Sequence, residues 1–176
     1  MHSERLLLRE MKETDWPHVH AYASQERVCQ FQPWGPNTEQ DTREYLREVL
    51  EDAAKQPRKR YVFAIIHKET TSLIGAVELS IKSFPDSEGE IGYIIHPDHW
   101  GKGVAAEASR LVMGFGFEKL KLHRISATCS PDNVSSARVL EKLGMVREGR
   151  IQQHLRLKEG WRDSLLYSAL ECEWPG

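Results

Sequence analysis

One stretch in the middle of the chain, EIGYIIHPDHWGKGVAAEA (residues 90–108), places a strand-like run before a glycine-rich turn and a helix-forming run. The first amides of a helix have no partner within it, and the helix dipole adds partial positive charge there. Glycines in the turn let an anion approach the backbone without obstruction by a Cβ atom. The pattern therefore predicts a phosphate or pyrophosphate held by backbone amides. The predicted amides are those of Gly101, Lys102, Gly103, Val104 and Ala105.

This turn is a poor match to two common nucleotide-binding motifs. A P-loop requires Ser or Thr after its lysine, but Lys102 is followed by Gly103. A dinucleotide fingerprint places a third glycine where Ala106 stands, although a small residue can serve there. Taken alone, the motif is also compatible with a tight strand-to-helix turn that binds nothing.

Strand-like and helical patterns alternate along the rest of the chain. We expect strands at residues 5–10, 61–67, 72–81, 90–95 and 123–129, two more around 158–161, and helices after Thr38, Gly103 and Asn133. Thr38 and Asp41 form a capping-box-like pattern at the start of the first of these helices. Short polar connectors between the three central strands indicate an antiparallel meander. The strand, glycine turn, helix and strand that follow indicate a βαβ unit. The pattern predicts an α/β or α+β fold with a mixed sheet, without defining the strand order.

Composition restricts the setting and the partners. The 176 residues carry a formal net charge of -2, so no broad basic surface is expected to attract nucleic acid or an anionic membrane. Cys29, Cys129 and Cys172 are odd in number and far apart, which fits neither a disulfide framework nor a zinc site. The N-terminus lacks the apolar core of a signal peptide, and no apolar run is long enough to span a bilayer. We expect a cytoplasmic protein with a single domain over residues 1–176.

Four segments resemble the GNAT acetyltransferases. WGKGVA (residues 100–105) resembles the superfamily's Q/R-x-x-G-x-G/A turn, with tryptophan in place of Gln or Arg. NVSSARVLEKLGM (residues 133–145) resembles the N-x-x-S…K-x-G-F signature, with methionine in place of Phe. SERLLLRE (residues 3–10) and GWRDSLLYSALECEW (residues 160–174) resemble the branch named for ribosomal-protein alanine N-acetyltransferases. The resemblance implies a GNAT fold, which has a mixed, mostly antiparallel sheet flanked by helices on both faces. It also implies acetyl-CoA as cosubstrate and no metal.

The resemblance also suggests roles for particular residues. It implies that the strand of residues 90–95 splays from the next strand, leaving backbone groups near Ile94 and Ile95 free for the pantetheine arm and the acetyl carbonyl. Ser136 matches the Ser of N-x-x-S and is the candidate for protonating the leaving thiolate, and Asn133 is a candidate for binding the pantetheine arm. Both also have structural interpretations, because a helical serine can bond back to its own helix and Asn133 can cap it.

The general base is the least defined part of the predicted site. Glu90 begins the splayed strand and is our first candidate, because partial burial would raise its pKa toward a useful range. Glu78 on the neighbouring strand is the second candidate and His154 the third. Some relatives carry an acid on the penultimate strand, but the stretch IQQHLRLKE has none before Glu159, so an ordered water can replace a side-chain base.

The acceptor amine also has several interpretations. The nearest branch suggests a protein N-terminus, and the alternative within the class is a small-molecule amine such as a polyamine, an amino acid or an antibiotic. A non-catalytic sensor that holds acyl-CoA is the alternative from another class. Phe31 and Trp34 indicate either a substrate lid or a homodimer contact. Asp163 can orient a cationic amine, but a structural pairing with a basic residue is the preferred interpretation.

Overall fold

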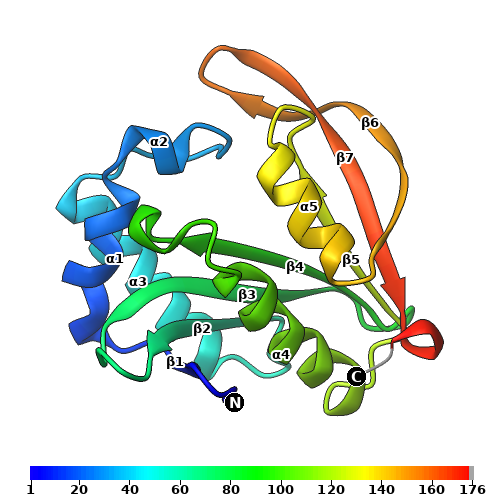
Figure 1. Cartoon of the computed structure of the whole chain (residues 1–176), viewed down its shortest axis with the longest axis horizontal. Coiled ribbons are helices and arrows are strands. Elements are labelled where there is room, and N and C mark those ends of the chain that lie inside the picture. Colours follow the sequence, from blue (N-terminus) through cyan, green and yellow to red (C-terminus); the bar gives the residue numbers. More distant parts are fainter. Residues whose placement is uncertain (175–176) are drawn as a thin grey trace.

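The computed structural model describes residues 1–174, which form a seven-stranded sheet with helices on both faces (Figure 1). The strands are β1 (Leu6–Glu10), β2 (Arg60–His67), β3 (Leu73–Ser83), β4 (Glu88–Ile95), β5 (Arg124–Cys129), β6 (Val146–Leu157) and β7 (Gly160–Leu170). The helices are α1 (Trp16–Ala23), α2 (Glu26–Cys29), α3 (Glu39–Ala54), α4 (Val104–Glu118) and α5 (Val134–Lys142). Short 3-10 turns are η1 (Glu13–Asp15), η2 (Pro97–His99) and η3 (Glu171–Glu173).

The strands follow the order β1-β2-β3-β4-β5-β7-β6 across the sheet. Every neighbouring pair is antiparallel except β4 and β5, which run parallel. The predicted mixed, mostly antiparallel sheet is therefore confirmed, as is the meander of β2, β3 and β4. The parallel pair is joined through α4, as expected for a βαβ unit.

Two apolar cores lie on opposite faces of this sheet. Helices α4 and α5 cover one face of the sheet. There Met113 and Leu140 are buried together with residues from every strand except the edge strand β6. Helices α1, α2 and α3 cover the other face, where Leu46 is buried against β2 and β3. Burying a side chain of this size contributes about 1.5–3 kcal/mol relative to leaving it exposed. No helix within residues 1–174 is long and apolar enough to cross a membrane.

The parallel pair β4–β5 is joined along only part of its length. Paired residues run from Glu88↔Arg124 to Glu90↔Ser126, and no pairing continues beyond that point between the two described strands. On its other side β4 stays paired with β3 as far as Ile95. The two strands therefore diverge, and a gap opens in the middle of the sheet toward the C-terminal end of β4 (Figure 1).

Local capping explains where two helices begin. Thr38 and Asp41 form the predicted capping box at the start of α3, in which the Asp41 amide donates to Thr38 Oγ1 over 3.2 Å. At the start of α5, Asn133 Oδ1 accepts from the Ser136 amide over 3.0 Å. This cap orients the first turn of α5, which borders the gap.

Gly75 shows how tightly β3 is packed against β4. A Cβ atom at this position would lie 2.4 Å from the carbonyl oxygen of Ile94, so the backbone would have to shift. We expect Gly75→Ala to lower the free energy of unfolding by about 1–3 kcal/mol, the usual cost of overpacking. Urea unfolding measures the change, with Gly149→Ala as the control because its added Cβ meets nothing within 4 Å. Equal stability of the two variants would contradict this packing.

Candidate active site

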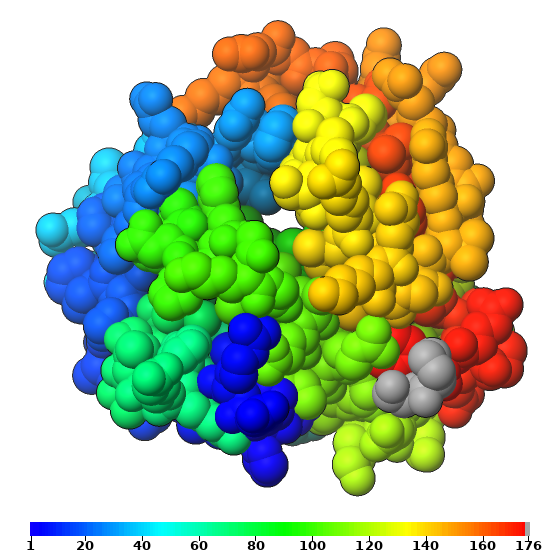
Figure 2. Space-filling model, viewed as in Figure 1, coloured from blue at the N-terminus to red at the C-terminus, as the bar shows by residue number. Residues whose placement is uncertain are grey.

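The gap between β4 and β5 contains a cavity of about 140 Å³. The space-filling view shows a hollow where α5 faces the loop after β4 and the segment around α2 (Figure 2). The lining comes from both strands, from α5 and from segments distant in the sequence. It consists of Phe31, Gln32, Ile91, Gly92, Tyr93, Ala127, Thr128, Cys129, Ser130, Asn133, Ser136, Leu140, Leu155 and Arg162.

The register of β4 determines which of its backbone groups face the gap. The His96 amide donates to the Ile74 carbonyl over 2.8 Å, so the backbone of His96 faces β3. Because backbone direction alternates along a strand, the N–H and C=O groups of Ile94 also face β3, whereas those of Tyr93 and Ile95 face the gap. The expectation that Ile94 offers free backbone groups is thus wrong, since both its N–H and its C=O point toward β3.

Trp100 forms a hydrogen bond with one of the backbone groups that face the gap. Its indole Nε1–H donates to the Ile95 carbonyl over 2.8 Å, while the residue as a whole remains 47% exposed. The tryptophan that replaces Gln or Arg at this position thus supports the end of β4 by a hydrogen bond. The Ile95 amide faces the gap beside it and is a suitable donor for a carbonyl oxygen.

The glycine turn has the geometry of an anion site. Gly101 and Gly103 have φ values of +72° and +78°, in the left-handed region that glycine adopts without strain. Helix α4 begins at Val104, whose buried side chain anchors the turn, and the first intrahelical bond runs from the Glu107 amide to the Gly103 carbonyl. The N–H groups of Val104, Ala105 and Ala106 therefore have no intrahelical partner and can bind an anion.

Polar side chains near the N-terminus support this turn, a feature that the sequence patterns did not reveal. The Arg5 guanidinium donates to the Lys102 carbonyl over 3.3 Å from two nitrogens, and it forms an ion pair with Glu107. Ser3 Oγ donates to the same Glu107 carboxylate over 2.5 Å. The N-terminal segment thus fixes both the turn and the first turn of α4. The acid at the start of a helix was a visible signal, but its partner is 102 residues away.

Ser136 lies on the cavity wall beside a tyrosine. Its Oγ is 2.8 Å from the Tyr93 hydroxyl oxygen, and that hydroxyl is also 3.3 Å from the Ser136 carbonyl. Burial raises the pKa of Tyr93 to about 12, so this hydroxyl stays protonated and can donate. Tyr93 was not among the residues predicted from the sequence, although strand alternation with the buried Ile91 and Ile95 indicates which way it points. Asn133 also lines the cavity, with Oδ1 used for capping.

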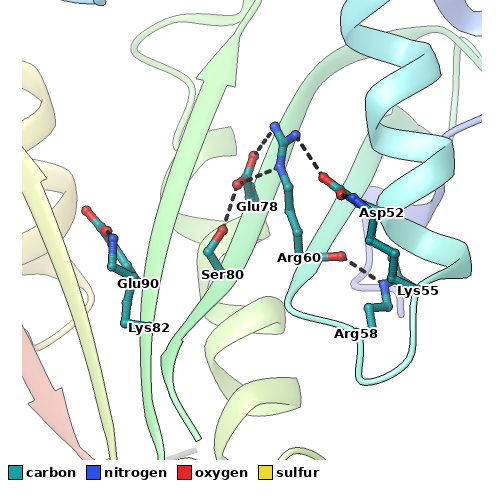
Figure 3. Close-up of polar contacts among 8 residues, drawn as sticks. All are labelled: Asp52, Lys55, Arg58, Arg60, Glu78, Ser80, Lys82 and Glu90. Atoms are coloured by element: carbon teal, nitrogen blue, oxygen red, sulfur yellow. Dashed lines mark hydrogen bonds and ion pairs between the residues drawn. The ribbon is translucent and has the colours of Figure 1, made fainter.

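Glu90 lies at the last residue pair before the strands diverge, opposite Ser126. Its carboxylate is 2.8 Å from Lys82 Nζ, and it is not part of the cavity wall (Figure 3). This contact with Glu90 raises the pKa of Lys82. Gly92, two residues further along the same strand face, does line the cavity. Two residues of strand span roughly 6.6 Å, so Glu90 borders the site without entering it.

Glu78, which pairs with Gly92 on the neighbouring strand, and His154 do not line the cavity either. The Glu78 carboxylate accepts two hydrogen bonds of 2.9 Å from Arg60 and one of 2.8 Å from Ser80 (Figure 3). A carboxylate with three such donors is a structural ion pair more than an available base. His154 lies in the irregular part of β6, and its buried Nδ1 has no hydrogen-bond partner among the described residues. Its neighbour Leu155 lines the cavity, whereas His154 does not.

The β6–β7 hairpin continues past the end of β5 (Figure 1), and its Leu155 and Arg162 line one side of the cavity. Arg162 on β7 donates from Nη1 to the Phe31 carbonyl over 2.5 Å, which ties the hairpin to the segment after α2.

Asp163 has the structural role favoured by the sequence, because its carboxylate accepts from Arg150 and from the Gln153 amide. Phe31 lines the cavity, which agrees with the lid interpretation of this segment.

Comparison with known proteins identifies the family. Residues 5–146 match the Acetyltransferase (GNAT) domain. This chain belongs to the GNAT acetyltransferase family. It is 36% identical over 172 residues to the uncharacterized N-acetyltransferase YnaD of Bacillus subtilis (strain 168), covering 98% of this chain and 97% of the relative. The resemblance inferred from the four motifs is confirmed, and the chain is an N-acetyltransferase.

Two solved structures of this family share the fold. A GNAT-family acetyltransferase from Bacillus anthracis superposes with a TM-score of 0.86 and 36% identity, covering 98% of this chain and 99% of that one. The ribosomal-protein-S5-alanine acetyltransferase from Vibrio fischeri superposes with a TM-score of 0.83 and 28% identity, covering 100% and 98%. The GNAT fold class is therefore established for this chain.

Proposed function

We propose that this acetyltransferase moves an acetyl group from acetyl-CoA to a primary amine by direct attack within a ternary complex. The observation that carries the proposal is the gap between β4 and β5, which lies beside the helix N-terminus at Gly103. The turn offers amides to the pyrophosphate, and the gap offers the Ile95 amide to the pantetheine arm and the acetyl carbonyl. Residues 1–176 act as one catalytic domain in this proposal.

The reaction requires two proton movements and no covalent enzyme intermediate. The amine forms a bond to the acetyl carbon and loses a proton, the C–S bond breaks, and the thiolate gains a proton. Cys129 is the thiol on the cavity wall, and burial raises its pKa, so the nucleophilic thiolate is disfavoured. Direct attack by the amine is therefore favoured over acetylation of the enzyme, and holding the two reactants together supplies much of the rate.

Glu90 is the proposed base, acting through a water because its carboxylate stands outside the cavity wall. We expect Glu90→Gln to lower kcat about tenfold without changing KM for acetyl-CoA. This loss is below the roughly 100-fold that a directly contacting base often supplies, because solvent water retains access to the amine. Steady-state release of free thiol measures the effect.

Glu88→Gln is the matched control, since Glu88 is on the same strand and pairs with Arg124. An unchanged kcat in Glu90→Gln would assign deprotonation to solvent alone.

Two acceptor classes fit this reaction: a protein N-terminus and a small-molecule amine. The Vibrio fischeri relative, a ribosomal-protein-S5-alanine acetyltransferase, supports the first class. The small volume of the cavity supports an acceptor whose reacting end is small, which both classes can provide.

Calorimetric titration with acetyl-CoA and with free CoA, followed by a thiol-release assay with amines, tests the proposed function. Saturable binding of acetyl-CoA and amine-dependent thiol release are the expected results. Binding without turnover by any amine would favour the acyl-CoA sensor, and absence of binding by the folded protein would overturn the proposal.

A further inference from the structure

Among the residues that the structure describes, Arg162 is the only charged one that lines the cavity. It lies on β7 opposite Leu155, beyond the last pair that joins β7 to β5 at Cys129↔Leu165. The cavity therefore has a cationic end beneath the hairpin. Its other end is formed by the diverging β4 strand, where the acetyl group is proposed to lie.

No carboxylate in residues 1–174 forms an ion pair with Arg162, and Asp132 acts on its charge only at longer range. Its three hydrogen bonds go to neutral oxygens: the Phe31 carbonyl at 2.5 Å, Ser164 Oγ at 3.2 Å and the Asp163 carbonyl at 3.2 Å. Arg60 and Arg124, by contrast, each contact carboxylates within hydrogen-bond distance. A half-buried guanidinium is costly unless it is paired, so this one is well suited to receive an anion.

The guanidinium retains donors for such an anion. It has five N–H groups, and the three hydrogen bonds above use one from each nitrogen. One N–H therefore remains on Nη1 and one on Nη2. Each can donate to an oxygen of a carboxylate, although a bound acceptor can also displace the Ser164 bond.

The same wall disfavours a polycationic acceptor. Apart from Arg162, it consists of apolar and neutral polar residues, and it contains no Asp or Glu to bind a second ammonium group. A second positive charge near Arg162 would be repelled in a site with reduced dielectric screening.

We propose that the acceptor is a small amino acid, whose carboxylate binds Arg162 while its amine reaches toward Gly92 and the acetyl carbonyl. This inference rests on the proposed function, and it selects within it an amine that carries its own anionic group. The roughly 140 Å³ of the cavity fit a compact zwitterion better than a drug-sized ligand, whose pockets are usually about 300–1,000 Å³.

The test is a thiol-release assay with the twenty common amino acids, each beside its carboxamide and its decarboxylated amine. Spermidine and a peptide with a free N-terminus and an amidated C-terminus complete the panel. At least one amino acid should be acetylated with kcat/KM about 20-fold above its carboxamide, the range expected for hydrogen bonds to a charged group.

Variants then assign the preference to Arg162. Arg162→Gln should lower kcat/KM for the amino acid to that for its carboxamide, while KM for acetyl-CoA stays unchanged. Arg162→Lys should restore part of the preference, because lysine keeps the positive charge but lacks the planar set of guanidinium donors. Arg156→Gln is the matched control, since it removes a positive charge from the exposed surface of the same hairpin. The wild-type preference itself does not depend on how any variant folds.

Four outcomes would overturn the inference. Preference for spermidine, for the amidated peptide or for carboxamides would show that the carboxylate is not recognised, and the proposed acetyl transfer would stand. An amino-acid preference that Arg162→Gln leaves intact would assign recognition elsewhere. Acetyl-CoA binding with no acetylated amine in the panel would reject this acceptor, whereas failure of acetyl-CoA to bind would also reject the proposed function.

Discussion

Replacing Gly103 with glutamate is expected to weaken acetyl-CoA binding by about 100-fold or more. The added carboxylate would stand at the N-terminus of α4, where three amides without intrahelical partners are proposed to bind the pyrophosphate. It would repel the phosphates and compete for the amides that bind them, a loss of about 3 kcal/mol at tenfold per 1.4 kcal/mol. Space is not the obstacle, because a Cβ atom here meets only Arg5 Nη2 at 3.9 Å.

Gly144→Glu is the matched control for this experiment. Gly144 has a φ of +81°, close to the +78° of Gly103, and a Cβ atom there meets nothing within 4 Å. Both variants therefore introduce the same charge and a similar backbone strain of about 1–2 kcal/mol. Calorimetric titration should show acetyl-CoA binding near the wild-type affinity in Gly144→Glu. Comparable binding by both folded variants would refute the anion site at the turn.

The sequence patterns correctly predicted features that depend on neighbouring residues. The capping box at Thr38 and Asp41, the meander of β2 to β4 and the glycine turn before α4 all follow from interactions among residues close in the chain. The divergence of β4 from β5 came from the family resemblance, because no local pattern reports where pairing between two strands stops.

Features that depend on distant residues could not be predicted in this way. Arg5 supports a turn almost 100 residues away, and Arg162 reaches the carbonyl of Phe31 across 131 positions. Strand alternation places Glu78 and Ser80 on one face, but it does not show that Arg60 binds the Glu78 carboxylate. The choice between Ile94 and Ile95 likewise required the register with β3, which only the folded sheet supplies.

Removing the hydroxyls of both Tyr93 and Ser136 is expected to lower kcat by about 100-fold. The two oxygens lie 2.8 Å apart on the cavity wall, and we propose that both hydroxyls donate to the sulfur as the C–S bond breaks. This is the lower end of the usual effect of a proton donor, because a thiol with a pKa near 8.5 is already a good leaving group. The double variant Tyr93→Phe with Ser136→Ala retains the aromatic ring and the small side chain, so the packing of α5 is expected to survive.

A double-mutant cycle shows whether the two hydroxyls act as one unit. Each single variant should lose most of the 100-fold, since removing either one breaks the hydrogen-bonded pair, and the losses should not multiply. Independent, multiplicative losses would instead mean that only one hydroxyl faces the sulfur and that the other has a separate role. Thermal unfolding of all three variants provides the control for stability.

The pH dependence provides a second test of the same pair. A donor works only while protonated, and the pKa of Tyr93 is raised by burial to about 12. The rate should therefore show no decline due to Tyr93 as pH rises through 10, the ordinary range of a tyrosine. Such a decline near pH 10 that disappears in Tyr93→Phe would show that Tyr93 titrates as an exposed phenol. That result would remove the burial on which its role as a persistent donor depends.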